Sequence, residues 1–571
     1  MKYMNERKYT VADALLDTLK AHGVSTIFGY PGGAILPFYD ALPFHTDIEH
    51  VLVRHEQGAA FAAEGFARST GKIGVCCATS GPGATNLVTG IADAMMDSVP
   101  ILCITGQVPL EMIGKDMFQE TDVTGVTLSI TKHNYLIERA EDIVPITTEA
   151  IAIALSGRQG PVLIDVPKNI MAAPHHEKFE IKSANILAQS AFAPAYEGIS
   201  DDLAQSVINA LAQAKRPILL VGQGVKHASA SELAEHFIEI TNIPTVTTIL
   251  AKGIVSETNP HYLGMLGMHG FYHSNHAMHN ADLILNIGSR FDDRIVGRYD
   301  VFGKNSLIIH VDIDRSELNK VVETHIPVHC DAKLFLEKML AHPDIKKLHI
   351  PDWQKKIQEW KQEKPYQKTT EHFSMRNCLA AIMEEVKKEP ERFIIVADVG
   401  QHQMWAALSC SVHSPHHFLT SGGAGSMGFA LPAAMGAAFA HPDKTILCIT
   451  GDGGVQMNIQ ELGTIKAYNL KVKVCVLNNF FLGMVRQWQE LFYDNNYSHV
   501  AFSNPDYTLL AKAYGIEGAL IDAKNCHEMP VLLSKMLNDP GPRVVEFRVE
   551  KEDNVYPMVP GGKHLGETIT G

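Results

Sequence analysis

The sequence predicts an α/β protein built from three doubly wound parallel-sheet domains. Apolar runs rich in branched residues alternate with segments of helical periodicity, and near-continuous apolar strands between helices are typical of a parallel sheet covered on both faces. This alternation recurs in three stretches, which two less regular segments separate. The length of 571 residues allows three or four domains at roughly 150 residues each.

The first stretch opens with a helix signal. Thr10 and Asp13 form a capping-box pattern, and Gly23 marks the end of that helix. Strands are then expected at His50–Val53, Ile73–Thr79, Pro100–Thr105 and Pro161–Val166. We place this domain at residues 1–180.

A segment of low periodicity, His175–Ile199, precedes the second stretch, which starts with the apolar run Arg216–Gly222 and gives a domain at residues 195–342. The charged segment His342–His372 follows, with five lysines between 355 and 368. We read it as a separator. The third domain covers residues 372–571, with strands expected at Phe393–Asp398, Thr445–Thr450, Lys473–Asn478 and Arg543–Val549. The first and third domains share a strand, glycine loop, helix and strand in that order, which is compatible with duplication or with the frequency of βαβ units.

Composition excludes several classes of protein. A net charge of −14 argues against nucleic acid as a ligand, because phosphate neutralisation needs clustered Lys and Arg. The longest apolar stretch, residues 429–440, is too short to span a bilayer, and Met1–Tyr9 lacks the apolar segment of a signal peptide. The nine cysteines show no metal-ligand spacing and predict buried free thiols in a reducing cytoplasm.

The most informative motif joins two strand ends. Gly451-Asp452-Gly453 follows one expected strand, and 24 residues later Asn478-Asn479 ends the next. Both halves should open into the crevice at the carboxyl ends of the strands, where ligands of open α/β sheets bind. Carboxylate and amide oxygens suit Mg²⁺, and the glycines allow backbone N–H groups to approach phosphate.

Further motifs stand in order along the chain: Tyr30-Pro31-Gly32-Gly33-Ala34, Arg54-His55-Glu56-Gln57-Gly58, Ser80-Gly81-Pro82-Gly83-Ala84-Thr85-Asn86, Gly106-Gln107-Val108-Pro109, Phe118-Gln119-Glu120-Thr121-Asp122, Gly288-Ser289-Arg290-Phe291-Asp292-Asp293-Arg294, Gly425-Ser426-Met427-Gly428 and Gly483-Met484-Val485-Arg486-Gln487-Trp488. With the Asp452 motif, they resemble the thiamine diphosphate enzymes and, among them, the catalytic subunits of acetohydroxyacid synthase (acetolactate synthase). The resemblance runs over nearly the whole chain. It implies an N-terminal pyrimidine-binding domain, a central FAD-binding domain and a C-terminal domain for the diphosphate and Mg²⁺.

The resemblance assigns roles around the thiamine cofactor. Glu56 would hydrogen-bond N1′ of the aminopyrimidine, which requires a site dry enough to raise the pKa of its carboxyl group. Met427 would hold the cofactor in its folded shape, and Asp452, Asn479 and the carbonyl of Phe481 would bind Mg²⁺. Taken alone, Glu56 is an ordinary first-turn helix residue and Met427 a core side chain.

A second set would line the path of the substrate. It comprises Gly33, Ala34, Phe118, Gln119 and Lys168. Met484, Val485 and Trp488 would lie on one face if their segment is helical, so that all three could line the pocket of the acceptor ketoacid. Lys168 could equally be a solvated loop lysine, and Trp488 a core residue packed behind the site.

The central domain would hold FAD. Its only spacing signal is Val221-Gly222-Gln223-Gly224, an incomplete dinucleotide fingerprint. The contacts that the resemblance implies are Arg158, Gly222, Gly224, Leu266, Gly267, Met268, His269, Gly288, Arg290, Asp292, Arg294, Asp312 and Asp331. The Arg290–Arg294 pattern favours the biosynthetic, FAD-containing type over the catabolic synthases that lack FAD.

His269, His273, His276 and His279 also tempt a metal interpretation, because on a helix they would form one stripe. Among 28 histidines such clusters arise by chance, and His269 lies in the glycine-flanked segment assigned to FAD. We therefore favour the interpretation without a metal.

The implied activity is acetolactate synthesis, a transferase reaction. Pyruvate is decarboxylated on thiamine diphosphate, and the hydroxyethyl unit is ligated to a second pyruvate or to 2-ketobutyrate, in branched-chain amino acid biosynthesis. A pyruvate oxidase with the same cofactors is the alternative, and a simple decarboxylase or a silent FAD-binding protein fits less well. The resemblance also implies a homodimer or tetramer and a small regulatory subunit.

Overall fold

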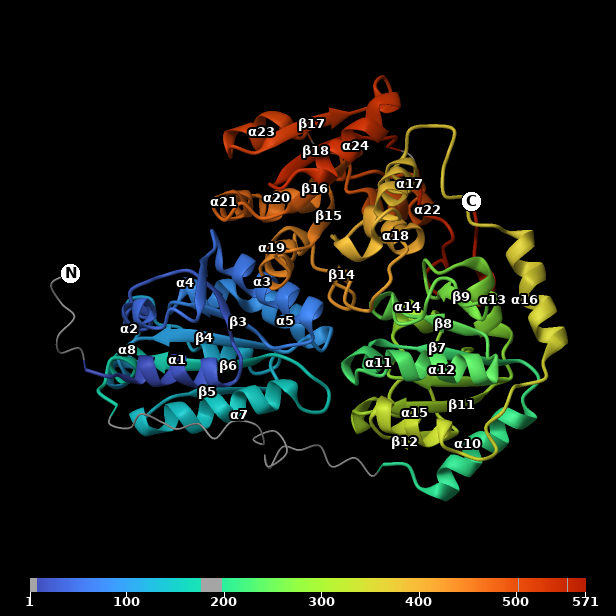
Figure 1. Cartoon of the computed structure of the whole chain (residues 1–571), viewed down its shortest axis with the longest axis horizontal. Coiled ribbons are helices and arrows are strands. Elements are labelled where there is room, and N and C mark those ends of the chain that lie inside the picture. The colour runs from blue at the N-terminus through green and yellow to red at the C-terminus, as the bar shows by residue number, and fades with distance from the viewer. Residues whose placement is uncertain (1–7, 176–197, 502, 552) are drawn as a thin grey trace.

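Three six-stranded parallel sheets, each covered by helices, form the molecule in the computed structural model (Figure 1). The structure describes residues 8–175, 198–501, 503–551 and 553–571. This architecture confirms the predicted α/β class with three parallel-sheet domains. The proposed boundaries 1–180, 195–342 and 372–571 stay a prediction, and most of the expected linker at residues 175–199 lies outside the described residues.

The N-terminal sheet has the strand order β2-β1-β3-β4-β6-β5. Its strands are β1 Thr26–Gly29, β2 Glu49–Leu52, β3 Gly74–Ala78, β4 Ile101–Gln107, β5 His133–Leu136 and β6 Val162–Pro167. Its helices include α1 Val11–Ala21, α2 Leu36–Ala41, α3 Glu56–Thr70, α4 Pro82–Asn86, α5 Val88–Met96, α6 Val123–Thr127, α7 Ile143–Leu155 and α8 Lys168–Met171. Thr10 and Asp13 form the predicted capping box at α1.

The C-terminal sheet repeats this order as β14-β13-β15-β16-β18-β17. Its strands are β13 Phe393–Ala397, β14 Phe418–Thr420, β15 Thr445–Gly451, β16 Val472–Asn478, β17 Glu517–Ile521 and β18 Arg543–Arg548. Its helices include α17 Met375–Val386, α18 Gln401–Ser409, α19 Ala430–Ala440, α20 Asp452–Met457, α21 Leu462–Ala467, α22 Gly483–Phe492, α23 Tyr507–Ala513 and α24 Met529–Asn538. The similarity predicted between the first and third domains therefore extends to the order of all six strands.

The middle sheet has a different order, β12-β11-β10-β7-β8-β9. Its strands are β7 Pro217–Val221, β8 Thr245–Thr247, β9 Tyr262–Met265, β10 Leu283–Ile287, β11 Leu307–Asp312 and β12 Ile326–His329. Its helices include α10 Asp201–Gln213, α11 Gln223–His227, α12 Ser231–Thr241, α13 Tyr272–Asn280, α14 Asp293–Val296 and α15 Ala332–Leu340. The chain order reverses between β7 and β10, and such a switch point is where open sheets bind ligands.

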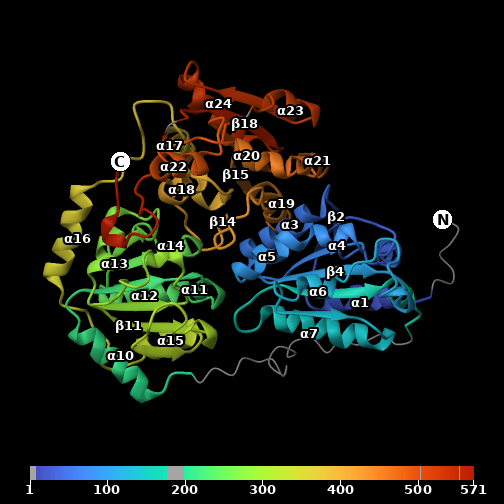
Figure 2. The same cartoon turned by 180° about the vertical axis from the view of Figure 1, so that it is seen from behind.

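The charged segment after residue 342 is more than a separator. It contains α16, Pro351–Glu363, which runs along the edge of the middle domain in both views (Figure 1, Figure 2). Trp353, Ile357 and Trp360 of this helix are buried, and the Trp353 indole donates to the carbonyl of Pro217 at 3.0 Å. These apolar residues recur at helical spacing, so the segment belongs to the core of the middle domain.

Helices α3 and α19 join the N- and C-terminal domains. Phe61 packs edge-to-face on Phe429 with ring centroids 5.6 Å apart. At Gly65 and Gly436, a Cβ atom would overlap the backbone of the opposite helix. The small residues thus allow two backbones to approach closely, which fixes the angle between the two outer domains.

The structure bears on two expectations from composition, the burial of the cysteine thiols and the length of apolar segments. Cys76, Cys77, Cys103, Cys448 and Cys475 are free and buried, as predicted. In the described ranges, no helix combines the length and the apolar character needed to cross a membrane.

Candidate functional site

The central feature of the middle domain is a cavity of about 660 Å³ at the carboxyl ends of its strands. All six strand ends of this sheet contribute, through residues that include Gly224, Thr248, Leu266, Gly288, Asp312 and Asp331. Met96, Asp97 and Arg158 of the N-terminal domain and Gly400, Met427 and Trp488 of the C-terminal domain complete the wall. The cavity therefore lies where the three domains meet.

Close backbone contact shapes one end of this cavity. The Gly224 N–H donates to the carbonyl of Gly288 at 2.9 Å, across the switch point between β7 and β10. A Cβ atom on Gly222 would overlap that same carbonyl, and one on Gly224 would press on the Gly288 backbone. The incomplete fingerprint of the sequence thus marks a real close approach of two loops, the type of cradle that dinucleotide ligands occupy.

Arginines bring positive charge to the cavity wall. Arg158 donates to Ser98 at 2.9 Å and forms an ion pair of 2.7 Å with Glu317, which ties the N-terminal domain to the middle domain. Arg290 and Arg294 also line the cavity, where their side chains contact the sulfur atoms of methionines 96 and 268. Such guanidinium groups suit an anionic diphosphate.

The acidic residues assigned to FAD have structural roles as well. Asp292 accepts the N–H groups of the first turn of α14, and Asp331 does the same for α15. Asp312 accepts the N–H of Asp314 at 2.8 Å. All three line the cavity, so these hydrogen bonds and a ligand contact are compatible at each.

The segment from Leu266 to His269 forms another part of the wall. Gly267 has a φ of +113° and its N–H donates to Asn275, so the chain turns sharply and places Leu266, Met268 and His269 on the cavity. Burial lowers the pKa of His269 to about 4. This histidine is therefore a neutral hydrogen-bonding group near neutral pH.

The remaining histidines of the stripe lie on α13, away from His269. His273 stacks on Phe271 and contacts the carbonyl of Leu263 at 2.8 Å, while His279 stacks on His564. Across the described part of the chain, no group of three or more His, Cys, Asp or Glu side chains is arranged to hold a metal ion. His276 packs on Tyr272 and Trp360, so each of these three histidines has a packing role.

Met484, Val485 and Trp488 lie on one face of α22 and line the same cavity as Met427. This is the geometry expected if the segment is helical. Met427 precedes α19 in a glycine-rich loop and is not part of the core. The sequence motifs therefore converge on one cavity wall from two different elements.

The Asp452 motif forms a compact polar corner. Gly451 of β15 pairs with Leu477 of β16, which brings Asp452 and Asn479 to adjacent strand ends. Both side chains are buried, and burial raises the pKa of Asp452 to about 6. The Asn479 amide nitrogen donates to Gln401 at 3.1 Å, which fixes the direction of its oxygen.

Asn504 completes this corner, and no motif in the sequence pointed to it. Its amide donates to Asp452 at 2.7 Å and to the Asn478 side chain at 2.9 Å. Phe480 follows the Asn pair with a φ of +61°, which turns the chain sharply before Phe481. The hard oxygen atoms of a carboxylate, an amide and a backbone carbonyl suit Mg²⁺ with room for diphosphate oxygens.

The predicted residues of the N-terminal domain that concern thiamine diphosphate and the substrate lie at the carboxyl edge of the N-terminal sheet. Glu56 begins α3 and accepts a hydrogen bond of 2.9 Å from Asn86. Gln119 lies against Gly81 with a φ of +60°. Gly33, Phe118 and Lys168 follow other strands of the same sheet. Neither Glu56 nor any other member of this set lines the cavity.

Glu56 and Met427 lie differently with respect to the cavity. Phe429, two residues after Met427, packs against both Phe61 in the middle of α3 and Arg68 near its end. Met427 lines the cavity wall, whereas Glu56 at the start of α3 does not.

Comparison with known proteins agrees with this architecture. Family models described as thiamine pyrophosphate enzyme match the N-terminal TPP binding domain at residues 9–126, the central domain at 204–339 and the C-terminal TPP binding domain at 398–547. The chain is 43% identical to the acetolactate synthase isozyme 1 large subunit of Escherichia coli K12 (99% of this chain, 98% of the relative). It is 42% identical to the isozyme 2 large subunit of the same organism (98% and 99%). It is also 43% identical to acetolactate synthase 1, chloroplastic, of Zea mays (98% and 88%).

These similarities cover nearly the full length of the chain and all three sheets. They also include the glycine cradle of the middle domain and the strand ends that carry Asp452 and Asn479. The chain therefore belongs to the acetolactate synthase large-subunit family of thiamine pyrophosphate enzymes.

Proposed function

We propose that this protein forms 2-acetolactate from two molecules of pyruvate, and 2-aceto-2-hydroxybutyrate when 2-ketobutyrate is the acceptor. The carrying observation is the pair of adjacent strand ends that presents Asp452 and Asn479 beside a cavity with Met427, Met484 and Trp488 on its wall. Family membership over nearly the whole chain supports the same reaction.

Asp452, Asn479 and the carbonyl of Phe481 would hold Mg²⁺ in this proposal. The donor set fits, because Asp452 is buried among amide donors and the Asn479 oxygen has a fixed direction. Thiamine diphosphate supplies the chemistry by accepting the electron pair released when CO₂ leaves the substrate. The chain's own residues would hold the Mg²⁺ that neutralises the diphosphate.

The middle cavity would hold FAD. The cradle of Gly222, Gly224 and Gly288 leaves no room for a Cβ atom, and the nearby arginines suit a diphosphate. We infer a structural role for FAD, because acetolactate formation involves no net oxidation or reduction. Loss of flavin should therefore weaken the wall of the site without removing a redox partner.

Glu56 would hold a proton at N1′ of the aminopyrimidine, and Gln119 and Lys168 would border the substrate path. Because Met427 lines the cavity and Glu56 of the same chain does not, we infer that two chains share each site. Large apolar side chains on both edges support this: Phe118 is 87% and Leu128 73% exposed on the N-terminal domain, and Val485 is 49% exposed near the cavity. A homodimer is thus the smallest active unit, and pairs of dimers would give a tetramer.

A small regulatory subunit is part of the proposal, because the relatives are named large subunits. Trp488 would border the acceptor position and favour the additional methylene of 2-ketobutyrate.

The test is a product assay on the purified chain with thiamine diphosphate, Mg²⁺ and FAD. Pyruvate alone should give acetolactate and CO₂, and addition of 2-ketobutyrate should give the second product. Consumption of oxygen in proportion to pyruvate, without acetolactate, would instead assign a pyruvate oxidase. Acetaldehyde as the main product would assign a decarboxylase.

A further inference from the structure

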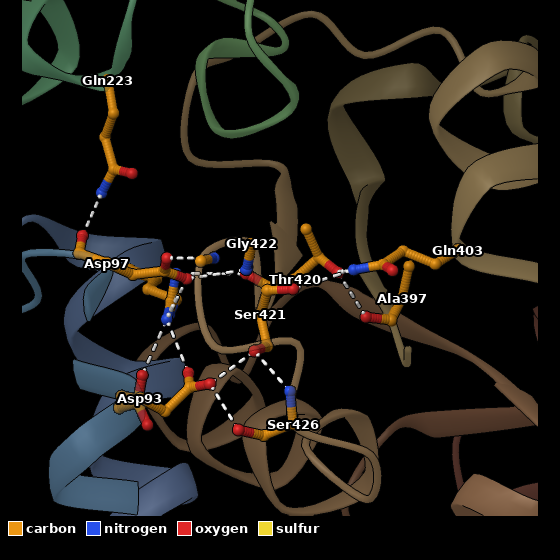
Figure 3. A network of polar contacts seen from close by, with 12 residues as sticks. Asp93, Asp97, Gln223, Ala397, Gln403, Thr420, Ser421, Gly422 and Ser426 are labelled. Carbon is orange, nitrogen blue, oxygen red and sulfur yellow. Dashed lines mark hydrogen bonds and ion pairs between the residues drawn. The ribbon is translucent and has the colours of Figure 1, made fainter. Parts of the chain in front are cut away.

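Two buried carboxylates of the N-terminal domain face a glycine-rich loop of the C-terminal domain (Figure 3). Asp93 lies in α5 and Asp97 directly after it, one helical turn apart. The loop is residues 421–427, which run from the end of β14 to Met427. Asp93 and Asp97 are both buried, and neither was identified from the sequence as a site residue.

Asp93 holds both ends of the loop. Its Oδ1 atom accepts the hydroxyl groups of Ser421 and Ser426, the latter at 2.7 Å. The Ser421 hydroxyl in turn accepts the N–H of Ser426 at 2.8 Å. One carboxylate oxygen therefore closes the loop on itself.

Asp97 holds the backbone between those ends. Its Oδ2 atom accepts the N–H of Gly422 at 2.8 Å, and its Oδ1 atom accepts the N–H of Gly423 at 2.6 Å. Its own carbonyl accepts the Gln223 amide of the middle domain at 3.1 Å, as Figure 3 shows. Asp97 thus connects the loop to the segment that follows Gly222.

Arg68 neutralises part of this charge. Its Nη2 atom donates to Glu64 at 2.8 Å, to Asp93 at 3.1 Å and to Asp97 at 2.9 Å. Three buried carboxylates share one guanidinium, and burial raises the pKa of Glu64 and of Asp93. Glu64 contacts none of the loop residues through these hydrogen bonds, which makes it a suitable control.

The loop needs such external support. Gly422, Gly423 and Gly425 have no side chains to pack, and Gly425 has a φ of +66°. A glycine-rich segment loses more conformational entropy on folding than other segments, so its shape must be imposed by its partners. All residues from Gly422 to Gly425, and then Met427, line the cavity.

We infer that Asp93 and Asp97 are positioning residues that hold residues 421–427 in the shape that places Met427 on the cavity wall. The inference rests on the proposed function only in that Met427 contacts thiamine diphosphate. Hydrogen bonds to ionised carboxylates are stronger than those between neutral groups. Loss of one should therefore loosen the loop while the rest of the fold persists.

The experiment compares Asp97→Asn with the control Glu64→Gln, which changes the same Arg68 cluster without touching the loop. Amide hydrogen exchange is followed in the apoprotein, without any cofactor. In Asp97→Asn we expect exchange in residues 421–427 to accelerate about tenfold, the scale of one lost charge-assisted hydrogen bond. The thiamine diphosphate concentration for half-maximal activity should rise about tenfold as well. Glu64→Gln should change both values less than Asp97→Asn does, because it keeps every direct hydrogen bond to the loop.

Ser426→Ala keeps the test decisive if Asp97→Asn fails to fold. It removes one hydroxyl from Asp93 and should accelerate exchange in the same residues by a smaller factor. Wild-type exchange and a wild-type cofactor requirement in Ser426→Ala and in folded Asp97→Asn would overturn the inference, as would equal changes in Glu64→Gln. Because exchange is measured without cofactor, a wild-type protein that makes no acetolactate would overturn only the proposed function.

Discussion

Two sheet edges of this molecule carry cofactor-type residues, and they differ in how completely one chain covers them. The carboxyl edge of the middle sheet opens into a cavity that residues from all three domains enclose, and Leu266 on its wall is only 4% exposed. The carboxyl edge of the N-terminal sheet carries Glu56 but leaves Phe118 87% exposed. This difference supports our proposal that a single chain would complete the flavin site, whereas the thiamine site would need the edge of a second chain.

The largest expected effect concerns the metal corner. Asp452→Ala should abolish Mg²⁺-dependent retention of thiamine diphosphate, because the diphosphate would lose its neutralising cation. Flavin content should stay at the wild-type level, since Asp452 does not line the cavity. The measurement is cofactor retention on a desalting column in Mg²⁺ and in EDTA, with exposed Asp443→Ala as control. Equal retention in both buffers would show that the motif does not bind metal.

The next effect concerns Glu56, at the carboxyl edge of the N-terminal sheet. Glu56→Gln should fold and retain FAD but lower turnover by roughly 10²-fold or more, the scale of lost proton-transfer catalysis. Steady-state turnover and flavin absorbance check this, with Glu49→Gln, an exposed residue of β2, as the matched control. Turnover close to the wild-type value in Glu56→Gln would remove the residue from the mechanism.

The third effect is smaller and concerns FAD, which the two preceding variants should retain. Gly222→Ala places a Cβ atom against the Gly288 carbonyl, so the cradle must open. We expect FAD to bind at least tenfold more weakly, because overpacking a close contact costs about 1–3 kcal/mol. Flavin titration followed by fluorescence gives the affinity. Normal flavin binding in this variant would mean that the glycine cradle is not the flavin site.

The smallest effect concerns acceptor choice. Trp488→Leu should shift competition between the two ketoacids towards acetolactate, because one methylene in an apolar pocket is worth roughly 1–3 kcal/mol. Pyruvate homocoupling should persist. Both products are quantified from a mixture of the two ketoacids, with Tyr493→Leu, an exposed residue directly after the helix and outside the cavity, as control. An unchanged product ratio would exclude Trp488 from the acceptor pocket.

The sequence predicted the long buried strands of the two outer domains, but it missed the short buried strand β1 and the strands β5, β14 and β17. Buried parallel strands such as β4 and β16 are continuous apolar runs, whereas β5 at a sheet edge, His133–Leu136, is only partly buried and has no such pattern. The lysines of α16 led us to interpret this segment as a separator, although Trp353, Ile357 and Trp360 have helical spacing. Charge on one face of a helix does not exclude burial of the other.

The site was predictable where its residues share a local motif. Asp452 and Asn479 lie at the ends of neighbouring strands, so their spacing in the sequence predicted that they lie close together. Asn504 reaches Asp452 from another loop, and Asp97 reaches Gly422 from another domain. Such contacts depend on tertiary folding, and no local spacing rule could have found them.

The central claim is that each thiamine site is shared between two chains, and mixing two inactive variants tests it most directly. Glu56→Gln and Asp452→Ala are purified separately, unfolded or dissociated together, and reassembled at equal concentration. In a mixed dimer, one site receives the intact Glu56 from one chain and the intact Asp452 from the other. Random reassembly should then restore about a quarter of wild-type activity. Activity no greater than that of the two variants measured separately, in a mixture shown to contain mixed dimers, would contradict the account.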